Sequence, residues 1–256
     1  MQREVAMNTI QQTSEKIIRF EAAFNRIHVK LRNMVKDPRP HAPYGDVLSK
    51  AKKLHSIVRY HYDHLRQFGN LRNAIVHQKM DKDFYIAEPH DWVIEEIERI
   101  SEVLLKPTPA LSIASQPVTS YSPETPLKEI LQKIDEKGYS QFPIYNKKEF
   151  AGMVTEGGIA KWLSQNSLKK HYISIDEVCV CDILPLEKKH SVKFLSKSNT
   201  IYDLEDAFKE SISKNEKLEA ILITEHGELK QKPIGIVSPR DLVRIEHTSF
   251  TLVNQM

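Results

Sequence analysis

The sequence predicts two folded domains in succession, an α-helical bundle followed by a mixed α/β domain. Three observations predict this: apolar residues recur with helical spacing as far as Leu104, a proline-rich segment follows, and beyond it short β-forming runs alternate with helical runs in an order that occurs twice. Helices show apolar residues three or four positions apart, whereas strands are shorter and rich in β-branched and aromatic residues. With 256 residues and 40% hydrophobic content, the chain can bury two separate cores.

We expect the first domain, residues 1–106, to be a four-helix bundle. Asp46 is the expected N-cap of the second helix, and Asp91 opens the fourth. Gly69 and Asn70 interrupt or bend the chain between the second and third helices, with Asn70 as an expected cap. The expected helices cover residues 9–35, 46–68, 70–80 and 91–104.

The segment KPTPALSIASQP contains three prolines and several small residues, so we expect residues 107–117 to be an inter-domain linker. The α/β domain then covers residues 118–247, and a C-terminal tail covers 248–256. Two similar copies make up this domain, the first at about 118–165 and the second at about 190–247.

Each copy places a polar residue before its first helix. Thr125 and Thr200 are the expected N-caps, and Asp203 follows Thr200 three residues later, as in a capping box.

The end of each copy carries candidate ligand-binding residues. In the second copy, GIVSPRD places the Ser238 hydroxyl and the Asp241 carboxylate at a helix start, where a carboxylate offers two oxygen atoms as hydrogen-bond acceptors. Arg240 can pair with a phosphate there. Ser238 can equally be a plain N-cap. The first copy, GMVTEGG, keeps a hydroxyl at Thr155 but has Gly158 where the second copy has Asp241, so we expect one working site.

These β-α-β-β-α copies resemble a tandem pair of CBS domains, over roughly residues 112–247. The resemblance implies an adenosine-type regulatory ligand such as AMP, ADP or ATP, with Ser238, Arg240, Asp241 and Thr155 as nucleotide-binding residues. We expect the apolar strand residues, among them Phe142, Pro143 and Ile144, to belong to the core rather than to a ligand platform.

The charge of the chain is unevenly distributed. Residues 1–80 contain 15 Lys and Arg against 6 Asp and Glu, a net charge of +9, whereas residues 81–256 contain 22 against 28, a net charge of −6. A basic segment beside a neutral-to-acidic one fits a polyanionic partner, although a solvated helix surface accounts for many lysines and arginines.

The sequence LRNAIVH places Arg72, Asn73 and His77 near the third helix of the bundle. Asn73 and His77 are four residues apart and share a helical face, with Arg72 at their flank. An imidazole can move a proton near neutral pH, and a guanidinium can stabilise negative charge on a phosphoryl group. These are the groups that metal-independent RNA cleavage by the 2′-hydroxyl requires, with Arg72, Asn73 and His77 as catalytic residues.

The bundle and this motif, over about residues 8–106, resemble the HEPN family. The resemblance implies a metal-independent endoribonuclease of the toxin or defence type, with a site formed across a two-fold dimer. A surface ion pair for Arg72 and an interface position for His77 are the alternative explanation.

Three hypotheses follow for the whole chain. The first is an adenine-nucleotide-regulated endoribonuclease, with no cofactor for catalysis. The second is a non-catalytic adenine-nucleotide sensor whose bundle mediates dimerisation or partner binding. The third is a protein that binds nucleic acid without cleaving it. The expected partners are a second copy of the chain, RNA and an adenine nucleotide.

We expect a cytoplasmic protein in a reducing compartment, since no apolar run is long enough for a membrane span and no signal-peptide pattern occurs. Cys179 and Cys181 fit alternate positions of a strand better than a disulfide or a metal site. His61 and His64 lack further ligands at a definite spacing, so we predict no metal.

Overall fold

The computed structural model divides the chain into two compact units, residues 1–108 and 109–256. It describes residues 2–77, 79–81, 84–85, 87–168, 174–187 and 192–244, and it describes side chains in the ranges 15–76, 87–168, 174–187 and 192–243. Each unit has its own core. Among the described residues, no helix has both the length and the apolar character that crossing a membrane requires.

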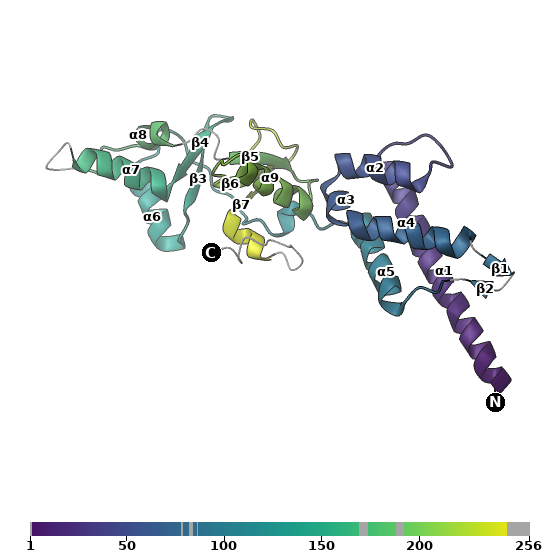
Figure 1. Cartoon of the computed structure of the whole chain (residues 1–256). Coiled ribbons are helices and arrows are strands. Elements are labelled where there is room, and N and C mark those ends of the chain that lie inside the picture. Colours follow the sequence, from purple (N-terminus) through teal and green to yellow (C-terminus); the bar gives the residue numbers. More distant parts are fainter. Residues whose placement is uncertain are drawn as a thin grey trace. The chain divides into compact units, whose positions relative to one another are not determined.

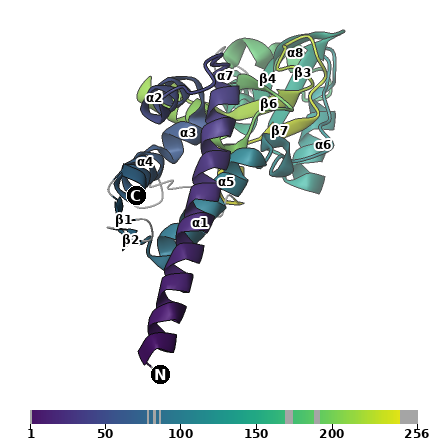
Figure 2. The same cartoon turned by 90° about the vertical axis from the view of Figure 1, so that its right-hand side faces the viewer.

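The first unit is helical (Figure 1). Its longest helix is α1, and α5 packs along it, as both views show (Figure 2). The apolar residues that recur along α1, such as Phe20, Ile27 and Leu31, are at most 1% exposed, so the helical periodicity of the sequence identified the buried face correctly. The elements are α1 Gln2–Met34, α2 Tyr44–Leu54, α3 Ser56–Tyr60, α4 Tyr62–His77, β1 Lys79–Asp81, β2 Phe84–Tyr85 and α5 Asp91–Leu105.

The expected second helix is wrong in its extent. His55 adopts an extended backbone conformation, with φ −129° and ψ 121°, and therefore ends α2, while a turn at His61 separates α3 from α4. The helix α2 begins at Tyr44, so Asp46 lies in its first turn rather than at its N-cap. The described part of the first unit thus has five helices in place of the expected four.

Helix α4 continues through the expected interruption. Gly69 and Asn70 both lie inside α4, so Asn70 does not cap a helix. The backbone N–H groups near Arg72 are therefore used within the helix and cannot hold a phosphate, as they would in a first turn. The expected fourth helix is confirmed, because α5 begins at Asp91.

The second unit contains the repeated order β-α-β-β-α that the sequence predicted. In the first copy, a single parallel bridge at Tyr121 replaces the first strand, and in the second copy β5 pairs in parallel with β6. The hairpin β3–β4 and the pair β6–β7 are antiparallel. The elements are η1 Ala110–Ser112, α6 Leu127–Lys137, β3 Gln141–Asn146, β4 Glu149–Thr155, α7 Glu156–Ser167, α8 Val180–Ile183, η2 Leu184–Leu186, β5 Val192–Ser196, α9 Ile201–Ser213, β6 Ala220–Thr224, β7 Gly235–Val237 and η3 Pro239–Arg244.

Most of the expected linker belongs to the folded second unit. Ala110 is fully buried in the core of the second copy, where it packs with Leu204 and Phe208. Ser115 exchanges two backbone hydrogen bonds with Ile236 of β7, of 2.9 and 3.2 Å. The segment preceding the first copy therefore completes the core of the second.

The two expected caps have different outcomes. At Thr200, the Asp203 carboxylate accepts hydrogen bonds from the backbone N–H (2.7 Å) and the hydroxyl (2.9 Å) of Thr200, which confirms the capping box at α9. Thr125 is not the N-cap of α6, because that position is Pro126. The Thr125 hydroxyl instead accepts a hydrogen bond from the backbone N–H of Ser122 (3.0 Å) in the preceding turn.

Candidate functional site

A cavity of about 600 Å³ lies inside the second unit, bounded by segments of both copies. This volume is in the range of small-ligand sites. Its walls come from residues 114–119, from residues 137–143 at the end of α6 and the start of β3, and from four residues near the end of β7: Ile236, Ser238, Arg240 and Asp241. The three second-copy residues that the sequence nominated therefore share one cavity.

The start of η3 fixes the position of the acid. Oδ2 of Asp241 accepts hydrogen bonds from the backbone N–H and the hydroxyl of Ser238, both at 2.8 Å. Ser238 and Asp241 thus form a local cap and also line the cavity, so both explanations considered for Ser238 hold. A carboxylate offers about four acceptor sites, so Asp241 is not limited to the two hydrogen bonds of this cap.

Tyr121 was missed by sequence reasoning. Its hydroxyl oxygen is shielded from solvent and has no hydrogen-bond partner among the described residues, and Tyr121 lines the same cavity. Burial raises the pKa of Tyr121, so the hydroxyl stays protonated and can donate. A buried hydroxyl without a partner is costly.

The apolar residues of β3 were expected to belong to the core alone, and their positions agree with this only in part. Phe142 is 1% exposed and belongs to the core of the first copy, as expected. It nevertheless borders the cavity, as does Pro143. Because strand residues border both core and cavity here, apolar character could not separate the two roles.

Thr155 does not line this cavity and is not joined to Ser238 and Asp241. It is the N-cap of α7, where its hydroxyl accepts a hydrogen bond from the Gly158 backbone N–H (3.0 Å). The Glu187 carboxylate accepts hydrogen bonds from the Thr155 backbone N–H (2.6 Å) and hydroxyl (2.9 Å). The nucleotide-binding role predicted for Thr155 therefore has no support from this cavity.

Comparison with known families decides what the first copy is. The sequence model of the CBS domain matches residues 110–165. Residues 110–165 are a CBS domain. The matched range begins at Ala110, within the segment that we expected to be a linker, in agreement with the folded state of that segment. The second copy follows the same element order, so the second unit is a CBS-pair-like region.

Solved structures similar to the CBS-pair-like region share little sequence with it. A signal-transduction protein with CBS domains from Burkholderia ambifaria is 18% identical, with 56% of this chain and 99% of that chain covered and a TM-score of 0.40. The CBS domain pair of protein MJ0100, in complex with 5′-methylthioadenosine and S-adenosyl-L-methionine, is 17% identical, with coverages of 54% and 94% and a TM-score of 0.39. CBSX2 in complex with AMP is 18% identical, with coverages of 54% and 89% and a TM-score of 0.35. Comparison with the curated proteins gives no match.

The predicted catalytic residues lie outside the CBS domain, on α4. Arg72 is half-buried and Asn73 is exposed, and both line a cavity of about 560 Å³ in the first unit. His77 is the last residue of α4, and its side chain lies outside the described residues. Arg72 and Asn73 are thus brought together, and the position of the His77 imidazole stays a prediction.

The prediction for the cysteines is wrong. Cys179 and Cys181 form a disulfide, because the chain turns at the start of α8 and brings their Cα atoms to 5.2 Å. With Asp182 they form the one group in the described residues whose ligand atoms are close enough for a metal ion. Sulfur atoms joined in a disulfide are not thiolate ligands, so this group does not argue for a metal.

Proposed function

We propose that this protein is an adenine-nucleotide sensor, with its ligand in the cavity between the two copies of the CBS-pair-like region. The observation that carries the proposal is that Ser238 and Asp241 of the second copy and Tyr121 of the first line one ligand-sized cavity. Asp241 accepts hydrogen bonds from the ribose hydroxyls, and Tyr121 contributes aromatic surface. Arg240 and Lys137, both exposed at the cavity, pair with the phosphate.

The role is regulatory, because these residues bind without supplying a reaction. The described lining of the cavity holds no His or Cys, and its one carboxylate, Asp241, forms a local cap with Ser238. We therefore assign this cavity to ligand binding rather than to catalysis. The CBS resemblance of the repeat implies the same adenosine-type ligand. AMP, ADP and ATP are all candidates.

Calorimetric titration with AMP, ADP, ATP and S-adenosyl-L-methionine tests this proposal. Replacing Asp241 by Asn keeps an acceptor for Ser238 and removes the charged acceptor for ribose, so affinity should fall by about tenfold to 100-fold. Asp203→Asn is the matched control, since Asp203 makes the same two hydrogen bonds to Thr200 and does not line the cavity. Absence of binding by all four ligands, or equal loss in the control, would overturn the proposal.

RNA cleavage by the first unit is a second candidate function. The observation that favours it is the place of Arg72 and Asn73 in a cavity that is lined by further cations. In this hypothesis, Arg72 stabilises the negative charge on the phosphoryl oxygens and His77 moves the proton. Asn73 orients the imidazole or a phosphate oxygen. A second copy of the chain completes the site. Nucleotide binding to the second unit would then regulate cleavage.

Incubation with RNA in the presence of EDTA tests this second function. Cleavage should persist without metal and disappear in His77→Ala, while AMP affinity is unchanged. If the unmutated protein leaves RNA intact with and without AMP, the chain is a sensor alone.

A further inference from the structure

The cavity of the first unit has a strongly basic wall. It lies between α1, the segment 40–45 and α4, and its cationic and titratable residues are His28, Arg32, His41, Arg66 and Arg72. No Asp or Glu is among the described residues that line it. Within the described part of the chain, Arg66 alone of these three arginines has a nearby carboxylate, at 3.9 Å from Asp63.

Two residues that line this cavity each have one side-chain nitrogen atom that is shielded from solvent. The two atoms are Nε2 of His28 and Nε of Arg32, and no hydrogen bond to either occurs among the described residues. A buried donor without a partner is destabilising, and more so when the group is charged. Burial lowers the pKa of His28. A hydrogen bond with the backbone of Ala42 opposes this shift, and the charges of Arg32 and Arg72 add to it, so both guanidinium groups lie near the imidazole.

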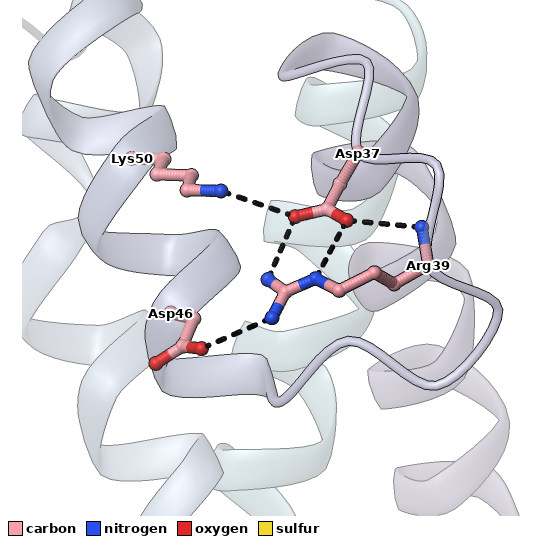
Figure 3. Close-up of polar contacts among 4 residues, drawn as sticks. All are labelled: Asp37, Arg39, Asp46 and Lys50. Atoms are coloured by element: carbon pink, nitrogen blue, oxygen red, sulfur yellow. Dashed lines mark hydrogen bonds and ion pairs between the residues drawn. The ribbon is translucent and has the colours of Figure 1, made fainter.

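Arg39, near this cavity, is an example of a guanidinium whose charge is neutralised by carboxylates. The guanidinium of Arg39 donates to both carboxylate oxygens of Asp37, at 2.9 and 3.0 Å, and it also lies 3.6 Å from Asp46 (Figure 3). Lys50 adds a further contact to Asp37, whose side chain is 1% exposed. This network ties the segment after α1 to α2 and so fixes one wall of the cavity. The described surroundings of Arg32 and Arg72 hold no such carboxylate.

The same cavity has an aromatic wall. The rings of Phe24 and Tyr44 both line it, with ring centroids 4.6 Å apart. The Tyr44 hydroxyl donates to the Leu65 carbonyl at 2.9 Å, which leaves the face of the ring as its contribution. Aromatic surface beside converging cations suits a ligand with a planar body and a terminal anionic group.

We propose that this cavity binds a small organic phosphate, with the terminal phosphate held by Arg32, Arg72 and His28 and the body of the ligand against Phe24 and Tyr44. A terminal phosphate carries up to two charges and fits cations that lie below the surface, whereas the internal diester of a long RNA strand carries one. Inorganic phosphate and the phosphate of a larger molecule share this chemistry. The proposal does not depend on nucleotide binding by the second unit or on RNA cleavage.

Titration with phenyl phosphate tests the proposal on the full chain. Phenyl phosphate should bind, inorganic phosphate should bind more weakly and compete with it, and phenol should not bind in the same concentration range. Arg72→Gln and Arg32→Gln should each weaken phenyl phosphate binding at least about tenfold. Lys53→Gln, which removes an exposed cation of α2 outside the cavity, should change it less than about twofold.

A second measurement keeps the test valid if an arginine variant folds poorly. In the unmutated protein, an NMR titration of His28 should show its pKa rising when phenyl phosphate binds, because the anion stabilises the imidazolium. Binding of phenol as strong as that of phenyl phosphate, an unchanged His28 pKa, or an equal loss in Lys53→Gln would overturn the proposal. Displacement of phenyl phosphate by a single-stranded RNA lacking a terminal phosphate would assign the cavity to RNA instead.

Discussion

In each copy, one carboxylate accepts two hydrogen bonds from the residue just before the helix that follows the last strand, one from its backbone N–H and one from its hydroxyl. The two carboxylates lie at different distances along the sequence from that residue. Asp241 bonds to the backbone N–H and hydroxyl of Ser238, and Glu187 bonds to the same two groups of Thr155. A Cβ atom at Gly158, the position that corresponds to Asp241, would lie 1.9 Å from Oε1 of Glu187. Glu187 therefore occupies the space of the acid that the first copy lacks.

This arrangement predicts a specific rescue. Gly158→Asp should destabilise the second unit by about 1–3 kcal/mol, because the new side chain collides with Glu187 and brings two carboxylates together. The double variant Gly158→Asp with Glu187→Gly should recover most of that loss, since the acid returns to its own position. Urea unfolding followed by the fluorescence of Trp162, which lies on α7, measures both.

Gly157→Asp is the control for that experiment, because a Cβ there would meet no atom closer than 3.6 Å. Its effect should be small. A double variant no more stable than Gly158→Asp alone would show that Glu187 does not stand in for the acid.

His61 makes the first unit sensitive to acid. It is 3% exposed, and burial lowers its pKa to about 4, with a smaller contribution from the charge of Arg99. An unfolded histidine has a pKa of about 6.5, so between about pH 6.5 and pH 4 the unfolded state binds a proton that the folded state does not. The free energy of unfolding should therefore fall over this window as the pH is lowered.

His61→Gln should flatten this pH dependence, while His90→Gln, at an exposed position of the same unit, should leave its slope unchanged. Urea unfolding at a series of pH values, followed by Trp92 fluorescence in a Trp162→Phe background, gives the slopes. Equal slopes for all three proteins would assign the acid sensitivity to other groups.

Sequence reasoning nominated those residues of the candidate site that lie close together in the chain. Ser238, Arg240 and Asp241 form one local motif, so their shared position followed from the sequence. Glu187 was missed because nothing local connects it to Thr155, 32 residues away. Tyr121 was missed because a buried aromatic residue looks like core until its hydroxyl is seen to lack a partner.

At the scale of elements, α4 shows how packing between helices overrides local preference. Glycine destabilises a helix interior, and for that reason Gly69 predicted an interruption. A Cβ at Gly69 would lie 2.9 Å from two ring carbons of Tyr44, which is held by its hydrogen bond to Leu65. The glycine is thus required by the close approach of Tyr44, and the helix continues through it.

Two glycine substitutions should therefore have opposite effects. Gly69→Ala should destabilise the first unit by about 1–3 kcal/mol through the collision with Tyr44. Gly45→Ala, in α2, should stabilise it by about 0.4–1 kcal/mol, because a Cβ there meets nothing within 4 Å. Thermal and urea unfolding of the two variants give the comparison, and a stabilising Gly69→Ala would contradict the packing argument.

The helices that were predicted best are those that bury one continuous apolar face of their own. Periodicity located α1 and α5, whose buried residues recur three or four apart. It could not locate the breaks at His55 and His61, because the apolar spacing continues across both. Such breaks depend on how the following helix packs, which a local pattern does not contain.

On the scale of the whole molecule, each unit contains one of the two tryptophans. Trp92 lies on α5 of the first unit and Trp162 on α7 of the second. Single-tryptophan variants, with Phe in the other position, therefore report separately on the unfolding of each unit. This property allows the two proposed ligands to be assigned to their units.

AMP at roughly 100 times its Kd should raise the free energy of unfolding reported by Trp162 by about 2.7 kcal/mol. It should leave the unfolding reported by Trp92 unchanged. Phenyl phosphate should have the reverse pattern. Stabilisation of the Trp92 signal by AMP alone would place the nucleotide in the first unit and contradict the proposed function.

The burial of Ala110 beside Leu204 and Phe208 also decides how the second unit can be divided. The two copies follow one another in sequence, but the residues that precede the first copy pack in the core of the second copy. A fragment that starts at Val118 would expose that interior, and Gly235, where a Cβ would touch Leu111 and Ala114, would face an empty groove. The second copy therefore needs the residues that precede the first copy, and a fragment designed to fold should begin within the segment 107–117 that was expected to be a linker.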